Sequence, residues 1–167
     1  TPGEVARWWA QAVAQADVYQ ALTRTLVALL EKLPMDGRFA MECLGLRAST
    51  HKRLAQIEYR IAVYVKDDPV RQNQHLEQSW FHLDEALHAY AQAVTGFFVN
   101  LGRPIQRIAT MHWVLVQQLS LATVLRRRVP EGTREAAYLS ARAYLDHPQP
   151  MEQAWAHGSL AELHLLE

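Results

Sequence analysis

Histidine and carboxylate side chains are concentrated between residues 75 and 90, in the segment HLEQSWFHLDEALHAY. Within it, Glu85 and His88 have the Glu-x-x-His spacing of some carboxylate-bridged metal sites. This spacing suits a shared metal ion, because residues three apart lie on one face of a helix. His82 is another possible ligand, since it precedes Glu85 by three residues. The segment therefore raises the hypothesis of a metal-dependent active site.

The number and spacing of these residues argue against a metal site. Two helical turns separate His75 from His82, about 10.5 Å along the axis, so one ion cannot bind both. A ferritin-like di-metal site needs two Glu-x-x-His motifs and two further inward glutamates, whereas this chain has only the motif at residues 85–88. We therefore predict a solvated helix flank without metal, which carries His75, His82, Glu85 and His88.

His112 differs from these histidines because it lies on an apolar stripe, between Ile108 and Leu115. A buried neutral imidazole, bonded to a backbone carbonyl or to a polar partner such as Thr23, is the expected role. The alternative is a catalytic or ligand role for His112.

Two arginine–histidine pairs raise a second catalytic hypothesis. Arg107 precedes His112, and Arg142 precedes His147, with four residues between the members of each pair. This spacing resembles the Arg-x4-6-His motif of the HEPN ribonucleases, and the resemblance implies RNA cleavage in a dimer groove. That family has a polar residue after the arginine, whereas an apolar residue follows both arginines here. The resemblance therefore puts a ribonuclease site forward only as an alternative.

Composition and missing motifs narrow the function further. Lys+Arg and Asp+Glu number 17 each, so no net charge attracts nucleic acid. The single cysteine, Cys43, excludes an intramolecular disulfide and lies on an apolar stripe. The sequence has no glycine-rich phosphate loop, no Gly-x-Ser-x-Gly elbow and no paired-cysteine zinc motif. We therefore predict no catalytic residue, no metal ligand and no cofactor.

Helical periodicity runs through four long segments, which glycine and proline clusters separate. The first segment begins at Thr1-Pro2, the second at Asp36, the third at Asp68-Pro69 and the fourth at Pro104. The third has the most regular stripe, formed by Leu76, Trp80, Leu83, Leu87, Tyr90, Val94, Phe97 and Leu101. We predict an all-α fold: an antiparallel bundle of four long helices over residues 1–129 and a short α-hairpin over residues 130–167. A break in the second helix near Ser49 stays open.

The hairpin resembles a tetratricopeptide repeat (TPR) entered at its second helix. Ala136, Ala143 and Pro148 match the small, small and helix-ending positions of that helix, and Leu160, Ala161 and His164 match positions of the next helix. Ser140 departs from the family pattern, because an aromatic residue is expected there. The resemblance implies a superhelical array that binds peptides or proteins and continues beyond Glu167.

Adjacent aromatic residues supply the candidate binding side chains. Trp8-Trp9, Trp80-Phe81 and Phe97-Phe98 each place two rings about 100° apart on a helix, which widens the apolar face. The outer rings Trp8, Phe81 and Phe98 are the predicted protein-contact residues. We predict a non-catalytic interaction or oligomerisation module of a larger cytoplasmic protein, with a protein partner or self-association and without nucleic acid or membrane. The alternative is a hydrolase that uses His82, Glu85 or His112.

Overall fold

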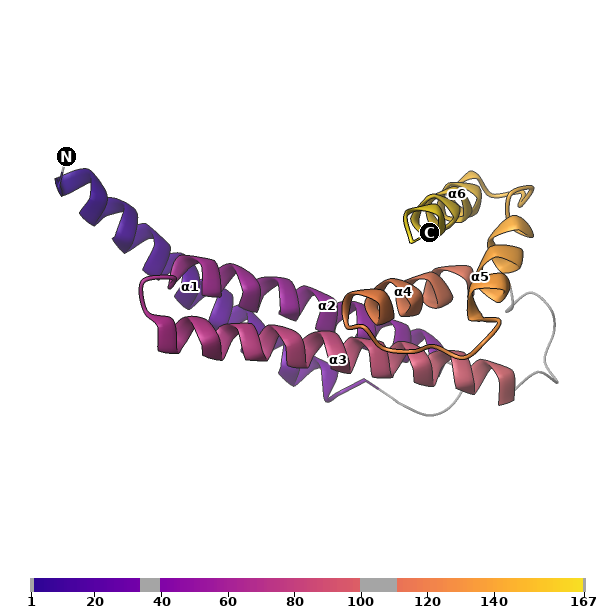
Figure 1. Ribbon diagram of the computed structural model, residues 1–167, viewed down its shortest axis with the longest axis horizontal. Coiled ribbons are helices and arrows are strands. Elements are labelled where there is room, and N and C mark those ends of the chain that lie inside the picture. The colour runs from indigo at the N-terminus through magenta and orange to yellow at the C-terminus, as the bar shows by residue number, and fades with distance from the viewer. Residues whose placement is uncertain (1, 34–39, 100–110, 167) are drawn as a thin grey trace. The chain divides into compact units, whose positions relative to one another are not determined.

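The described part of the chain, residues 2–33, 40–99 and 111–166 of a computed structural model, consists of helices and their connections (Figure 1). The helices are α1 (Pro2–Leu30), α2 (Ala40–Tyr64), α3 (Pro69–Val99), α4 (Met111–Val124), α5 (Thr133–Arg142) and α6 (Pro150–Leu165). This part contains no β-strand, so the all-α fold class is confirmed. Within the same ranges, no helix combines the length and the apolar character needed to cross a membrane.

The start of α3 is where the sequence predicts it. Pro69 is the first helical residue, and the Asp68 carboxylate accepts a hydrogen bond from the Arg71 backbone N–H at 3.1 Å. This N-cap satisfies one of the backbone donors that have no partner inside the helix. The second helix is continuous through Ser49. The predicted boundaries at Thr1, Asp36, Gly102 and Pro104 lie outside the described residues.

The chain divides into two compact units, and each is described by itself. Unit 1 comprises Thr1–Pro34 and Leu46–Ala86, and unit 2 comprises Met35–Gly45 and Leu87–Glu167. Helices α2 and α3 each contribute to both units. The division at residue 129 predicted from the sequence stays a prediction.

In unit 1, α1 packs on α2 through a narrow apolar stripe. Ala16 is buried against Ile61 and Val65, and Tyr19 packs on the same cluster. The rings of Tyr19 and Tyr64 stack with their centroids 6.3 Å apart. Most other α1 side chains are exposed, so this one stripe joins α1 to its neighbour.

The face of α3 that is buried in unit 1 differs from the predicted one. Ser79, His82 and Ala86 are buried, whereas the Trp80 side chain is 53% exposed. The prediction that Trp80 belongs to a buried stripe is therefore wrong. Serine and alanine let the backbones of α2 and α3 approach closely, which the larger side chains of the predicted stripe would prevent.

In unit 2, α4 is the most buried helix and packs against α5 and α6. Trp113 of α4 lies edge-on to the Tyr90 ring, with centroids 5.7 Å apart. A Cβ atom at Gly45 would lie 3.3 Å from the Trp113 ring, so glycine permits this close approach. The buried alanines of α5 and α6 are Ala137, Ala141 and Ala156, whereas Ala143 and Ala161, which the TPR resemblance places in close helix contacts, are exposed.

Candidate functional site

A series of polar contacts joins α2 to α3 in unit 1, and we call it the polar ladder. Its members are Gln72 Nε2 to Ala62 O (3.4 Å), His75 Nδ1 with Glu58 Oε2 (2.7 Å), Ser79 Oγ to Ala55 O (2.9 Å), His51 Nδ1 with His82 Nδ1 (3.1 Å) and Arg47 Nη2 with Glu85 Oε2 (3.9 Å). The sequence separations of the first four contacts are 10, 17, 24 and 31 residues. Each step thus advances about one turn along both antiparallel helices.

The regular step of the polar ladder follows from helix geometry. From one contact to the next, each helix advances by three or four residues, which together make seven. Steps of three and four residues keep the same face of each helix at the interface, as in antiparallel coiled coils. Ala55 and Ala62 accept hydrogen bonds through their backbone carbonyls, which a small side chain leaves accessible. The ladder therefore combines small residues with polar ones at positions where long helices usually place leucine.

The two histidines His51 and His82 form the most buried contact between side chains in the ladder. Their residues are 7% and 6% exposed, and their Nδ1 atoms lie 3.1 Å apart, so one ring donates and the other accepts. Burial lowers the pKa of both imidazoles, although the nearby Glu85 carboxylate opposes this effect at each ring. His51 itself lowers the pKa of His82 further. The pair is therefore neutral at neutral pH.

Two helical turns nearer the α2–α3 connection, His75 contacts Glu58. The Glu58 residue is 7% exposed, and the His75 side chain is 13% exposed. The 2.7 Å separation allows the His75 Nδ1–H to donate a hydrogen bond to the Glu58 carboxylate. A protonated imidazole would make this hydrogen bond an ion pair as well. An imidazole and a carboxylate from different helices therefore meet in a partly buried contact.

The prediction of a solvated flank is wrong for His82 and His75. It is correct for His88, which is exposed and bonds to Gln92 Nε2 at 2.9 Å. Glu85 is half-buried and faces Arg47. The physical reason is the antiparallel neighbour: α2 brings His51 and Glu58 to the same side, which converts a polar flank into an interface.

A metal centre needs more ligands than the ladder brings together. Two imidazole nitrogens 3.1 Å apart are close enough to face one ion. Among the residues that the structure describes, however, no group of three or more His, Cys, Asp or Glu is arranged to hold a metal ion. The His51–His82 contact is accordingly interpreted as a hydrogen bond that fixes the register of two helices.

His112 lies in unit 2, where it is 1% exposed. Its Nδ1 lies 2.8 Å from Ser159 Oγ of α6, and burial lowers its pKa, which the Glu152 carboxylate partly offsets. The predicted burial of His112 is confirmed, but its polar partner is Ser159 and not Thr23. The Thr23 hydroxyl donates instead to the Tyr19 carbonyl of its own helix at 2.8 Å.

The second arginine–histidine pair does not converge. The Arg142 guanidinium lies over the Tyr138 ring at 5.7 Å, whereas the His147 ring stacks on Tyr144 at 4.6 Å. His147 Nδ1 also accepts a hydrogen bond from the Gln149 backbone N–H at 3.3 Å. These partners give both side chains structural roles. Arg107 lies outside the described residues.

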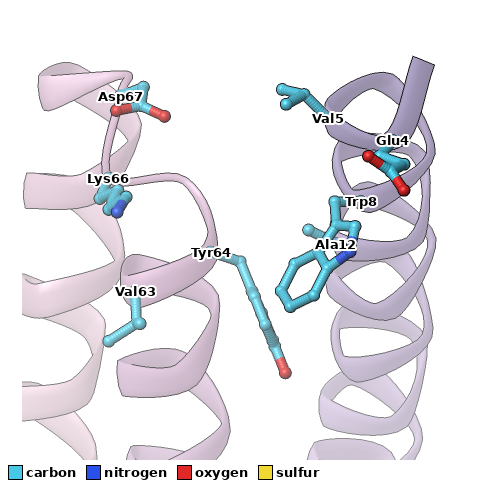
Figure 2. Close-up of a pocket in the computed structure, with 8 residues that line it drawn as sticks. All are labelled: Glu4, Val5, Trp8, Ala12, Val63, Tyr64, Lys66 and Asp67. Atoms are coloured by element: carbon cyan, nitrogen blue, oxygen red, sulfur yellow. The ribbon is translucent and has the colours of Figure 1, made fainter. Parts of the chain in front are cut away.

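Trp8 lines a groove between α1 and the end of α2, which we call the α1–α2 groove. The Trp8 residue is 79% exposed, and Figure 2 shows its indole and the Tyr64 ring extending into the space between the helices. Val5 and Val63 line the same groove, whose volume is about 490 Å³. Of the other predicted contact residues, Phe81 is 52% exposed, and the side chain of Phe98 lies outside the described part of the structure.

A second groove, the α2–α3 groove, has a volume of about 660 Å³. It is lined by Arg53, Ala55, Gln56, Tyr59, Arg60, Leu76, Ser79, Trp80 and Leu83. The exposed fractions of Tyr59 and Trp80 are 56% and 53%. The sequence does not reveal this surface, because the spacing of Leu76, Trp80 and Leu83 also fits a buried stripe.

Neither groove is lined by His51, His82 or His112. The surface features of unit 1 and the buried imidazoles are therefore separate features of the molecule.

Comparisons of the chain with protein-family models, with curated proteins and with solved structures found no match.

Proposed function

We propose that this chain is a non-catalytic helical module for protein–protein interaction or oligomerisation. The observation that carries the proposal is the exposure of Trp8 and Trp80, each along a groove between packed helices. Tryptophan and tyrosine are enriched among the residues that contribute most to protein interfaces, because they bury a large area with few rotamers. Exposed aromatic grooves of this kind are typical of interaction surfaces.

The polar ladder supports this function indirectly. A buried polar contact made in one register loses its partners in any other, so the ladder favours a single alignment of α2 and α3. The walls of the α2–α3 groove come from these same two helices. A fixed register therefore keeps the groove in one shape before a partner binds, which lowers the entropic cost of association.

The alternative is a helical hydrolase, either HEPN-like or metal-dependent. The contact between His75 and Glu58 is the observation in its favour, because an imidazole beside a carboxylate is a frequent acid–base arrangement. The contact lies in a helix–helix interface, and neither residue lines the two grooves. The interaction module is accordingly the better-supported function.

The finer predictions from the sequence belong to this proposal. They are the antiparallel four-helix bundle, the TPR-like hairpin after residue 130 and the cytoplasmic location. Each stays a prediction.

Substitution of the groove tryptophans tests the proposal. The full chain and its Trp8→Glu and Trp80→Glu variants are compared for self-association by sedimentation and for capture of other proteins on a resin. We expect at least one groove variant to lose an interaction that the wild type makes. Trp155→Glu is the matched control, because Trp155 of α6 is 54% exposed and lines neither groove.

Two results would contradict the interaction role. The first is a wild-type chain that neither self-associates nor captures a protein in a tryptophan-dependent way. The second is hydrolytic activity that His75→Ala or His82→Ala abolishes while circular dichroism shows an intact helical fold.

A further inference from the structure

We propose that the α2–α3 groove binds the same face of a second copy of this chain. The inference rests on the interaction role proposed above and names the partner. It follows from the apolar wall of the groove, from the charges beside it and from the register that the polar ladder imposes on α2 and α3.

The apolar wall of the groove has the spacing of a helix-packing stripe. Leu76, Trp80 and Leu83 are four and three residues apart on α3, and each keeps part of its surface exposed. On α2, Tyr59 forms the facing wall, whereas Ile61 packs against α1. Because residues two apart point to different sides of a helix, the groove and α1 occupy different faces of α2. The α2–α3 layer thus has one open apolar face.

The charges around this face are self-complementary. Arg53 and Arg60 are exposed, line the groove and are seven residues apart, and no carboxylate is among its lining residues. Arg53 bonds to the uncharged Gln56 side chain at 2.9 Å. On α3, the exposed acid Glu77 borders Trp80. One copy therefore offers two cations on α2 and an anion on the neighbouring helix α3.

The polar ladder sets the heights of these charges along the layer. Ser79 is level with Ala55, and His75 is level with Glu58, so Glu77 lies at a height between Arg53 and Arg60. A two-fold axis parallel to the helices leaves every residue at its own height. Such an axis places Glu77 of the second copy beside the two arginines of the first, and the same contacts recur by symmetry.

The resulting arrangement has four helices, two from each copy. Helix α3 of each copy lies over α2 of the other, in an antiparallel direction, and the apolar walls around Trp80 and Tyr59 become the interior. The arginines and Glu77 lie at its edges, where opposite charges determine which surfaces associate. A second copy satisfies both the apolar and the charged features of the groove.

Charge reversal tests this dimer in the full chain. The first variant carries Arg53→Glu and Arg60→Glu, and the second carries Glu77→Arg. We expect a wild-type dimer by sedimentation velocity, and for each variant alone a dissociation constant raised by at least about tenfold, because like charges then face each other. An equimolar mixture of the two variants should form a heterodimer, since every facing pair is again of opposite charge.

A control separates this effect from a general loss of stability. Arg24→Glu with Arg128→Glu reverses two exposed charges that do not line the groove, and this variant should dimerise like the wild type. Circular dichroism verifies that all variants fold. Recovery of association in the mixture cannot result from two misfolded chains, so it identifies the surface directly.

The opposing outcomes also distinguish the two proposals. A monomeric wild type at all concentrations, or variants that dimerise as tightly as the wild type, overturns the second copy as the occupant. If that monomer captures a different protein through Trp80, the inference fails and the interaction role stands. If it captures nothing, both fail.

Discussion

The α2–α3 interface of unit 1 and the α4–α6 core of unit 2 are both contacts between helices, but they differ in chemistry. The first contains His51, His82, Glu58 and Ser79 among small residues. The second is built around an apolar cluster of Met111, Leu115, Val116, Leu119, Ala137 and Leu163, and the buried contact between His112 and Ser159 lies in the same unit. Apolar burial supplies most of the folding free energy in proteins, whereas buried polar contacts contribute little net energy and disfavour other alignments. Apolar burial in unit 2 therefore contributes mainly to stability, whereas the polar ladder mainly fixes the register of α2 and α3.

The largest effect is expected in the apolar cluster. Leu115→Ala removes a side chain that is 3% exposed and leaves a cavity, so the free energy of unfolding should fall by about 3 kcal/mol. Urea titration followed by circular dichroism measures the change. The control Leu139→Ala lies on an exposed site and should change stability by less than about 0.5 kcal/mol. Equal losses in the two variants would contradict the assignment of this cluster as the core.

A smaller effect is expected where one partner of a polar contact is removed. His51→Ala leaves the buried Nδ1 of His82 without its partner, which should lower the free energy of unfolding by about 1–3 kcal/mol. The double variant His51→Leu/His82→Leu replaces both partners by apolar groups and should recover most of that loss. A double-mutant cycle in urea measures the coupling. A double variant that is less stable than either single one would show that the pair contributes more than register.

Acid should weaken both units, because burial lowers the pKa of His51, His82 and His112 below 6.5. The unfolded chain then binds protons more readily than the folded chain, so stability is complete above pH 6.5 and decreases as the pH falls through the folded-state values. Urea titrations at about pH 7.5 and about pH 5.5 measure the difference, around the ordinary histidine pKa of about 6.5. Replacement of His51 and His82 by leucine should reduce this pH dependence, and an unchanged slope would contradict the buried neutral pair.

The smallest effect concerns the start of α3. Asp68→Ala removes the hydrogen bond to the Arg71 backbone N–H and should cost about 1 kcal/mol of stability. Asp68→Asn keeps an acceptor and should restore most of it. Thermal melts of the three proteins provide the comparison. An alanine variant as stable as the wild type would mean that the ladder, not the cap, positions the start of α3.

Local features of the sequence were sufficient to predict the helices. The cap at Asp68, the proline at Pro69 and the alternating apolar spacing specify α3 through interactions within a few residues of the chain. The all-α class and the burial of His112 follow from the same kind of signal.

The choice of neighbours was not predictable from those patterns. Trp80 and His82 lie on nearly opposite faces of α3, and only the identity of the packed helix decides which is buried. Because α2 presents His51 and small residues, the polar face of α3 is the interface in unit 1, and Trp80 of the apolar stripe stays largely exposed. A periodicity shared by the polar residues of α2 and α3 was the signal that could have identified the ladder.

The regular increase of seven residues between successive ladder contacts also has a consequence for how α2 and α3 come together during folding. Each contact closes a loop seven residues longer than the one before it, beginning near the connection between α2 and α3. Once one contact is formed, the added loop-closure entropy of the next is small, because that entropy grows only with the logarithm of loop length. Helices α2 and α3 can therefore pair progressively from the turn that connects them, and such a series of local steps favours rapid folding.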